Sequence, residues 1–157
     1  IGLAGGLEFY GYVEDTNGWL DEFGLSGTFS ATTWQAPSTG TGNNYTVYQQ
    51  NIDWDLKDKK GRTNLERAQK GLAPKGADGK SINLHHSKQN SKGPLFEIQE
   101  STHRKYDRTN ALHPHKVSGL GKHPHNKVNR KQFNKDRKQY WIDRANEESK
   151  RRNSYSK

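Results

Sequence analysis

Two short hydrophobic runs in the middle of the chain predict β-strands, and in the first of them hydrophobic and polar residues alternate as on one face of a strand. Ile82 and Leu84 form one face of the first run. The second run, residues 95–98, follows a loop that contains glycine. Ser101 can then cap a helix that we expect to extend to about Leu112. The predicted local order is strand, loop, strand, helix.

A longer helix with one hydrophobic face is predicted near the C-terminal end. Asn129 is a favourable N-cap, and Val128 before it is placed to pack against Phe133. The opposite face is rich in lysine and arginine, so this helix is expected both to close the core and to present charge. We expect residues 149–157 to form a frayed basic tail. The hydrophobic stripe consists of Phe133, Tyr140, Trp141 and Ala145.

The composition before this region predicts a boundary between linker and domain. Residues 26–44 are rich in Ser, Thr, Gly and Asn, a composition that does not offset its own ordering entropy. We therefore predict a flexible linker over residues 26–46 and a folded domain over residues 47–148. Inside that domain, Thr63 and Glu66 have the spacing of a capping box and predict the start of a helix.

Charge is distributed unevenly along a chain that has little material for a core. Only 28% of the 157 residues are hydrophobic, so the core must be small. Residues 1–56 hold seven acids and no lysine or arginine, whereas the other 101 residues carry 26 basic and 10 acidic side chains, a net charge of +16. Such a charge predicts binding to a polyanion through phosphate contacts, although charge alone is also compatible with a role in solubility.

The chain carries no sign of a membrane segment. It has no run of about 18 apolar residues and no basic-then-apolar start, so we expect neither a membrane span nor a signal peptide. It starts at Ile1 and contains no methionine, which indicates a piece of a longer polypeptide. The absence of cysteine leaves the redox compartment undecided.

Histidines are the candidate chemical groups. All seven lie between His85 and His125, and without cysteine a transition metal must be held by imidazole, carboxylate, amide and water ligands. Neighbouring strand residues point to opposite faces, so His85 and His86 cannot both face one ion without distortion. One imidazole could therefore bind a metal while the other acts as a base, which suits phosphodiester hydrolysis.

The surrounding residues extend this pair into a longer pattern. They are Asn83, Leu84, His85, His86, Gln89, Gly93, Leu95, Glu97, His103, Leu112, His113, Arg130, Phe133, Asp136, Arg137, Tyr140, Trp141, Arg144 and Ala145. Over roughly residues 47–148 the chain resembles the LHH nucleases, a group within the HNH/endonuclease VII superfamily. The resemblance implies a small α+β fold in which helices flank a ββα-metal finger. It also implies one divalent metal ion, for which Zn, Ni, Mn and Mg all stay open.

The resemblance assigns roles position by position. His86 would be the general base, His85 a metal ligand from the strand, and His103 a metal ligand from the helix. Gln89 stands near the middle asparagine of the superfamily, whose side chain orients either the hairpin loop or the base. Together these four residues form the expected catalytic centre.

Further candidates rank behind this centre. Asp107 is expected either to add a carboxylate ligand or to orient an imidazole, and His113 to be a third ligand or a phosphate contact. We interpret the segment around His115, His123 and His125 as a solvated basic loop, because lysines lie beside all three. The candidate phosphate contacts are Arg104, Arg130 and Arg137, of which the last two could instead pair with Asp136 or Asp143.

The first 25 residues carry a second resemblance. The pattern Gly-Leu-x-Gly-Gly-x-x-x-Tyr-x-Tyr-Val begins at Gly2, and Asp21 and Leu25 then match the ends of a closing Asp-Pro-x-Gly-Leu motif. Both features are similar to the end of the Rhs (YD-repeat) core, which cleaves itself at that motif; here Glu22 replaces the proline. The resemblance implies a cut after Leu25 that frees residues 26–157.

The two resemblances together predict a function. Rhs cores end in interchangeable toxins that are delivered into competing bacteria, commonly by type VI secretion. We therefore expect a secreted effector whose tip cuts DNA in the cytoplasm of a target bacterium, with an acidic immunity protein and the Rhs shell as further partners. Two alternatives stay open: a ribonuclease toxin that uses neighbouring histidines without metal, and a non-catalytic nucleic-acid-binding module with a structural metal.

Overall fold

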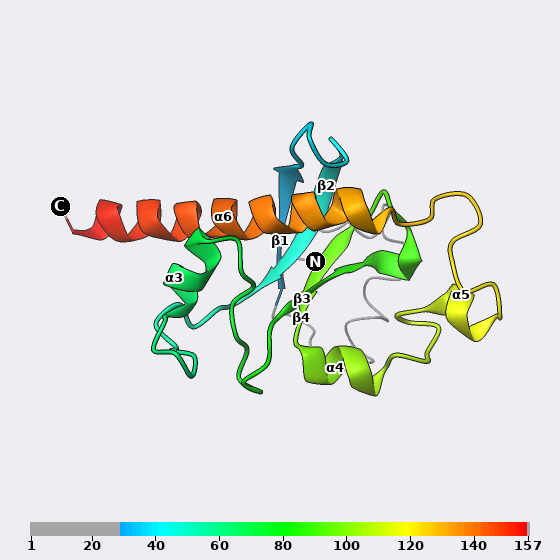
Figure 1. Cartoon of the computed structure of the whole chain (residues 1–157), viewed down its shortest axis with the longest axis horizontal. Helices are drawn as coiled ribbons and strands as arrows, with labels where there is room; N and C mark the ends of the chain where they lie inside the picture. Colours follow the sequence, from blue (N-terminus) through cyan, green and yellow to red (C-terminus); the bar gives the residue numbers. More distant parts are fainter. Residues whose placement is uncertain (1–28, 157) are drawn as a thin grey trace, which may run out of the picture.

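A four-stranded sheet and five helical segments make up the described part of this α+β fold (Figure 1), a computed structural model that describes residues 29–156. The predicted fold class is confirmed, while the proposed cleavage motif at Asp21 and Leu25 lies outside the described residues. The elements are β1 (Phe29–Gln35), β2 (Asn44–Gln50), α3 (Asn64–Gln69), β3 (Asn83–His86), the 3-10 helix η1 (Ser87–Gln89), β4 (Leu95–Ile98), α4 (Glu100–Lys105), α5 (Pro114–Val117) and α6 (Arg130–Tyr155).

The sheet lies between α6 and the loop that follows α4. Its strands are ordered β1-β2-β4-β3, with β2 and β4 parallel and the other two pairs antiparallel. On one face, the hydrophobic stripe predicted for the C-terminal helix is confirmed, since all four of its members are exposed by 1% or less. On the other face, Leu112 is fully buried in a cluster with Phe96 and Ile98. Burial of each such large side chain stabilises the fold by roughly 1.5–3 kcal/mol.

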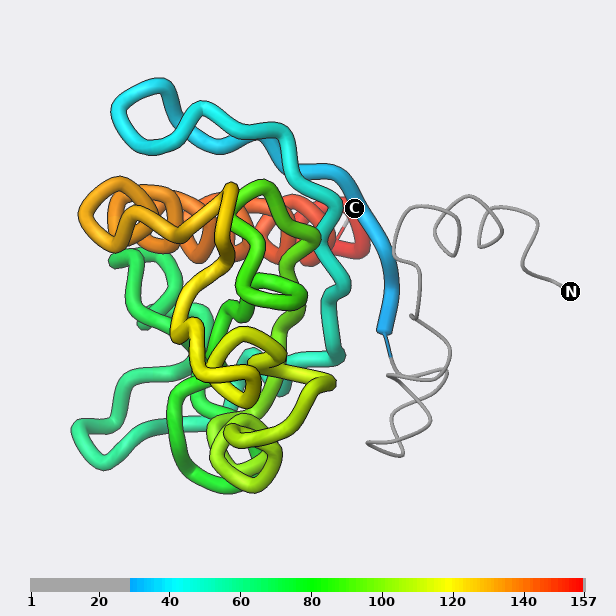
Figure 2. The backbone as a smooth tube through the Cα atoms, turned by 90° about the vertical axis from the view of Figure 1, so that its right-hand side faces the viewer, coloured from blue at the N-terminus to red at the C-terminus, as the bar shows by residue number. Residues whose placement is uncertain are grey.

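β1 and β2 form a hairpin, so the prediction of a flexible linker over residues 26–46 is wrong from residue 29 onward. Trp34 and Tyr45 face each other across this hairpin with stacked rings, and both are buried. The indole N–H of Trp34 also donates to Asp143 on α6, at 2.9 Å. Figure 2 shows the hairpin beside α6. The polar composition had suggested that the entropy cost of ordering would keep this segment flexible. Burial of the aromatic rings of Trp34 and Tyr45 offsets that cost.

α6 is longer than predicted. The prediction of a frayed tail over residues 149–157 is wrong as far as Tyr155, because the helix continues to that residue. Arg151 and Arg152 both pair with the carboxylate of Glu148, at 2.6 and 2.8 Å, and hydrogen bonds from these two arginines lower the pKa of Glu148 to about 2. Ion pairs at this spacing stabilise the last turns of a helix.

α4 is shorter than predicted, ending at Lys105 rather than near Leu112. The hydroxyl of Thr109 donates to the carbonyl of Tyr106 at 2.7 Å, a local bond that competes with helical hydrogen bonding. The chain then carries Leu112 into the cluster on the far face of the sheet. None of the helices between residues 29 and 156 combines the length and the apolar character that crossing a membrane requires.

A buried carboxylate joins the sheet to α6. Glu97 on β4 is fully buried and accepts hydrogen bonds from the Tyr140 hydroxyl at 2.6 Å and from the Arg144 guanidinium at 2.8 and 3.0 Å. The backbone N–H of Gln50 on β2 donates to the same carboxylate. These bonds satisfy a charge that would otherwise be costly to bury, and they join the middle of α6 to β4 and β2.

Candidate metal centre

Three histidines from three segments meet at the end of β3. His85 is on β3, His103 is on α4, and His113 immediately precedes α5. Their ring centroids are 5.1 to 5.2 Å apart, and one ring nitrogen of each lies within 4.8 Å of the others. The structure therefore brings together the two ligands expected first and adds His113, which the sequence ranked behind them. We call these three residues the histidine triad.

In His85 and His113, one ring nitrogen is used in a hydrogen bond and the other is available to bind a metal ion. His85 makes a hydrogen bond with the backbone of Leu112, and its buried Nε2 has no partner among the described residues. His113 directs Nδ1 to the carbonyl oxygen of Asp107, at 2.6 Å, which leaves Nε2 available. Metal-binding histidines commonly use one nitrogen for the ion and the other for a backbone or carboxylate oxygen.

Electrostatics favours the neutral form of two of the three imidazoles, those of His85 and His103. Burial lowers the pKa of His85 well below its ordinary value of 6.5, and the nearby rings of His103 and His113 lower it further. Burial and the neighbouring His113 also lower the pKa of His103. Neutral imidazoles are the form that binds metal. The unpartnered Nε2 of His85 and this all-nitrogen donor set fit a divalent transition metal that keeps positions open for other ligands.

Asp107 lies next to the triad but outside the group of convergent ligand atoms. It is not on α4, as the sequence had suggested, because that helix ends before it. Its carboxylate lies 3.3 Å from His113 Nδ1 and pairs with Lys116. Of the two expectations for Asp107, its geometry matches the orientation of an imidazole rather than direct ligation.

His86 lies on the other face of β3. Its ring contacts Phe133 of α6 at a centroid distance of 4.2 Å and Tyr45 at 6.1 Å, and only 5% of the residue is exposed. Burial, with a smaller contribution from the positive charge of Arg130, lowers the pKa of His86 to about 3. His85 and His86 thus point to opposite faces of β3, as predicted. The lowered pKa means that His86 is neutral near pH 7.

Gln89 connects the β3–β4 loop to the segment around α5. Its backbone is left-handed, with φ of 60°, and its side-chain oxygen accepts from the backbone N–H groups of His115 and Lys116 at 2.9 and 3.2 Å. Its side-chain nitrogen donates to the carbonyl of Gly121 at 2.9 Å. The side chain therefore orients the hairpin loop, one of the two roles expected for it.

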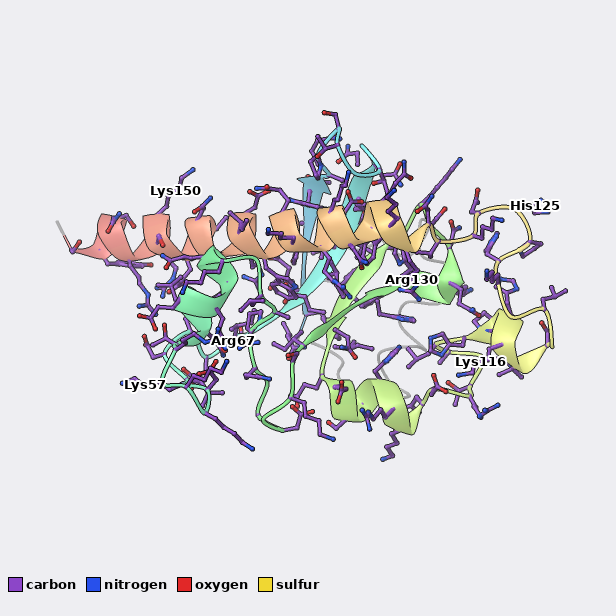
Figure 3. All side chains as sticks on the ribbon, viewed as in Figure 1. Lys57, Arg67, Lys116, His125, Arg130 and Lys150 are labelled. Carbon is purple, nitrogen blue, oxygen red and sulfur yellow. The ribbon has the colours of Figure 1, made fainter. Side chains whose placement is uncertain are left out.

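A cleft of about 760 Å³ opens beside the triad and is also lined by His86 and Gln89. Figure 3 shows Arg130 at the start of α6, near β3, and Lys116 on the neighbouring α5. Within residues 29–156, neither Arg130 nor Arg137 pairs with Asp136 or Asp143. Asp136 instead accepts hydrogen bonds from Thr41 and Tyr45. Asp143 accepts hydrogen bonds from Trp34 and Gln139. The basic residues that line the cleft are Arg67, Arg104, Lys122, Arg130 and Arg137.

His123 also lines this cleft, which the interpretation of a solvated basic loop missed. Its ring lies 4.8 Å from that of His115, whereas His125 is exposed. The available sequence signal was the repeated His-Pro-His motif at residues 113–115 and 123–125. Only the first copy contributes to the triad.

Comparison with known proteins yields one family. A family model described as a nuclease of the HNH/ENDO VII superfamily with conserved LHH matches residues 63–147, more than half of the chain. Leu84, His85 and His86 supply the Leu-His-His sequence of that description. No solved structure matches the chain.

Proposed function

Because the chain belongs to the LHH nucleases of the HNH/endonuclease VII superfamily, we propose that it is an endonuclease that cuts DNA with the help of one divalent metal ion. The observation that carries this proposal is the histidine triad in a basic cleft, with His86 on the opposite face of the strand that supplies His85. His85, His103 and His113 would hold the ion. When bound, it would supply Lewis-acid stabilisation of the charge that develops on the phosphoryl and leaving oxygens.

His86 would act as the general base. Its neutral imidazole accepts a proton from a water molecule in the cleft, the water oxygen attacks phosphorus, and the bond to the leaving oxygen breaks. A pKa of about 3 makes His86 a weak base in the free protein. A phosphate bound beside Arg130 would offset the positive charge there and favour the protonated form of His86, which raises that pKa toward a more useful range.

The arginines of the cleft would hold the substrate. Arg130 and Arg137 are exposed and free of acidic partners within residues 29–156, so their guanidinium groups are available to phosphate oxygens. Arg104 is less available because it lies 3.4 Å from Glu100. We expect backbone contacts rather than base contacts to dominate binding.

The electrostatics of the histidine pair favours this mechanism over the metal-free ribonuclease. A metal-free reaction at a 2′-hydroxyl needs one basic and one protonated imidazole. Burial lowers the pKa of both His85 and His86, which opposes the protonated form. A purely structural metal is also less favoured, because structural zinc sites are closed by four protein ligands and the triad offers three.

The biological setting that we propose rests on the resemblance of residues 1–25 to the end of an Rhs core. In this setting the chain is the tip of a secreted effector, cut after Leu25 at the motif that contains Asp21, and it acts in the cytoplasm of a target bacterium. The Rhs shell and an acidic immunity protein would be its partners, because the net charge of +16 after residue 56 suits an acidic surface. Since β1 is part of the sheet, we now propose that the folded domain starts near residue 29 rather than at residue 47.

The decisive assay compares nucleic acids with and without chelator. We expect the purified chain to nick and linearise supercoiled plasmid when Mn, Ni, Zn or Mg is added, and EDTA to abolish the reaction. His125→Ala is the matched control, since it removes an exposed histidine outside the cleft and should leave cleavage unchanged. Cleavage of RNA that survives EDTA and leaves cyclic phosphate ends would instead support the ribonuclease.

A further inference from the structure

The ring of His123 is held in one tautomer within the cleft. Its Nδ1 accepts hydrogen bonds from the backbone N–H groups of His125 and Asn126, at 3.1 and 2.9 Å. A backbone N–H can only donate, so Nδ1 carries no proton. The proton of the neutral ring is therefore on Nε2. This atom can donate a hydrogen bond to a ligand but cannot accept one.

The segment that carries His123 is anchored to the β3–β4 loop on both sides. Gln89 donates to the carbonyl of Gly121 at 2.9 Å, and the backbone N–H of Ser91 donates to the carbonyl of Asn126 at 2.8 Å. The His123 ring also packs edge-on against His115 at 4.8 Å. A side chain held in this way can bind a ligand at a small cost in conformational entropy.

His123 shares the cleft with the triad without touching it. Its ring contacts are with His115 and His125, whereas the triad rings contact one another. The cleft volume of about 760 Å³ exceeds that of a single phosphate group. A nucleic-acid strand that places one phosphate at the triad therefore has room to place a neighbouring phosphate elsewhere in the same cleft.

We infer that His123 binds the phosphate adjacent to the scissile one, by donating its Nε2 hydrogen to a non-bridging oxygen. This inference rests on the proposed nuclease function. The contact is present in the bound substrate as well as in the transition state, so it contributes to binding rather than to the chemical step. His123 would thus set how the strand lies relative to the triad.

The test compares a substrate that has a second phosphate next to the scissile one with a substrate that lacks it. One is a defined DNA oligonucleotide, and the other is bis(p-nitrophenyl) phosphate, which has a single phosphodiester. For His123→Ala we expect KM on the oligonucleotide to rise roughly 10- to 100-fold with kcat little changed. Hydrolysis of bis(p-nitrophenyl) phosphate and the metal affinity measured by calorimetry should match those of the unmodified chain.

A second variant separates substrate binding from support of the loop. In His123→Asn the side-chain oxygen can still accept from the two backbone N–H groups, but the donor at the Nε2 position is gone. We expect it to show the same rise in KM, while His125→Ala keeps the original KM. A normal KM for His123→Asn, or an equal loss on both substrates, would overturn the inference. If the unmodified chain hydrolyses neither substrate with any metal, the proposed function itself fails, and the inference fails with it.

Discussion

His113 shows how a metal site depends on residues that bind no metal. Its Nδ1 lies between the carbonyl and the carboxylate of Asp107, and the same carboxylate pairs with Lys116. Two adjacent oxygens hold Nδ1 and leave Nε2 available to an ion. Sequence alone placed Asp107 one helical turn after His103, a relation that the early end of α4 removes.

We predict that Asp107→Ala weakens metal binding by about 10-fold without abolishing it. The backbone carbonyl of Asp107 continues to accept from His113, so orientation is reduced rather than lost. Titration calorimetry with Zn or Ni measures the effect, and Glu100→Ala is the control because that acid pairs with Arg104 instead. An unchanged affinity for Asp107→Ala would show that the carboxylate does not support the site.

Glu148 makes the stability of the fold depend on pH. Its pKa falls from an ordinary 4.5 to about 2 in the folded chain, so its contribution is complete above pH 4.5 and is lost as pH falls toward 2. We therefore predict that Glu148→Gln lowers the thermal midpoint at pH 7 and that the difference from the unmodified chain shrinks between pH 4.5 and pH 2. Thermal unfolding followed by circular dichroism checks this, and a difference independent of pH would contradict it.

Secondary structure could be predicted where local signals and burial agree. The short hydrophobic runs at β3 and β4, the capping box at Thr63 and the stripe of α6 all follow from local sequence signals, and the structure contains each of them. β1 could not be predicted in this way, because its stability comes from partners far along the chain, such as Asp143. The end of α4 could not be predicted from local signals either, because it depends on the packing of Leu112 against the face of the sheet opposite α6.

Trp34→Ala tests whether the β1–β2 hairpin belongs to the folded domain. Trp34 is 8% exposed and packs against Tyr45 and Tyr140, so its removal should lower the free energy of unfolding by about 3–5 kcal/mol. Urea unfolding followed by fluorescence measures this loss. The exposed Thr33 on the same strand offers the control, since Thr33→Ala should change stability by less than about 0.5 kcal/mol. A linker would tolerate both substitutions equally.

Several basic residues line the cleft that contains the candidate metal centre. The sequence predicted a polyanion partner from the net charge after residue 56, and the fold collects five basic residues around one cleft. Which histidines would join the triad could be predicted only in part. His85 and His103 were assigned through the resemblance to the LHH nucleases, whereas the placement of His113 and His123 depends on the loop that Gln89 holds.

Salt should weaken DNA binding through specific residues of this cleft. We predict that affinity for a catalytically inert duplex, measured without metal, falls steeply with salt concentration. Arg130→Ala and Arg137→Ala should each reduce the slope of log affinity against log salt by about one. Lys150, which Figure 3 shows on α6 well away from Arg130, provides the control, and Lys150→Ala should leave the slope unchanged. Equal effects of all three would indicate attraction by overall charge alone.

In the proposed mechanism, His85 holds the metal and the adjacent His86 on β3 accepts a proton. The most direct measurement combines metal titration with plasmid cleavage for His85→Ala and His86→Ala. We predict that His85→Ala loses metal affinity, whereas His86→Ala binds metal as tightly as the unmodified chain and cleaves plasmid ~10²–10⁴-fold more slowly. Undiminished cleavage by His86→Ala, or a loss of metal affinity in that variant equal to the loss in His85→Ala, would contradict the account.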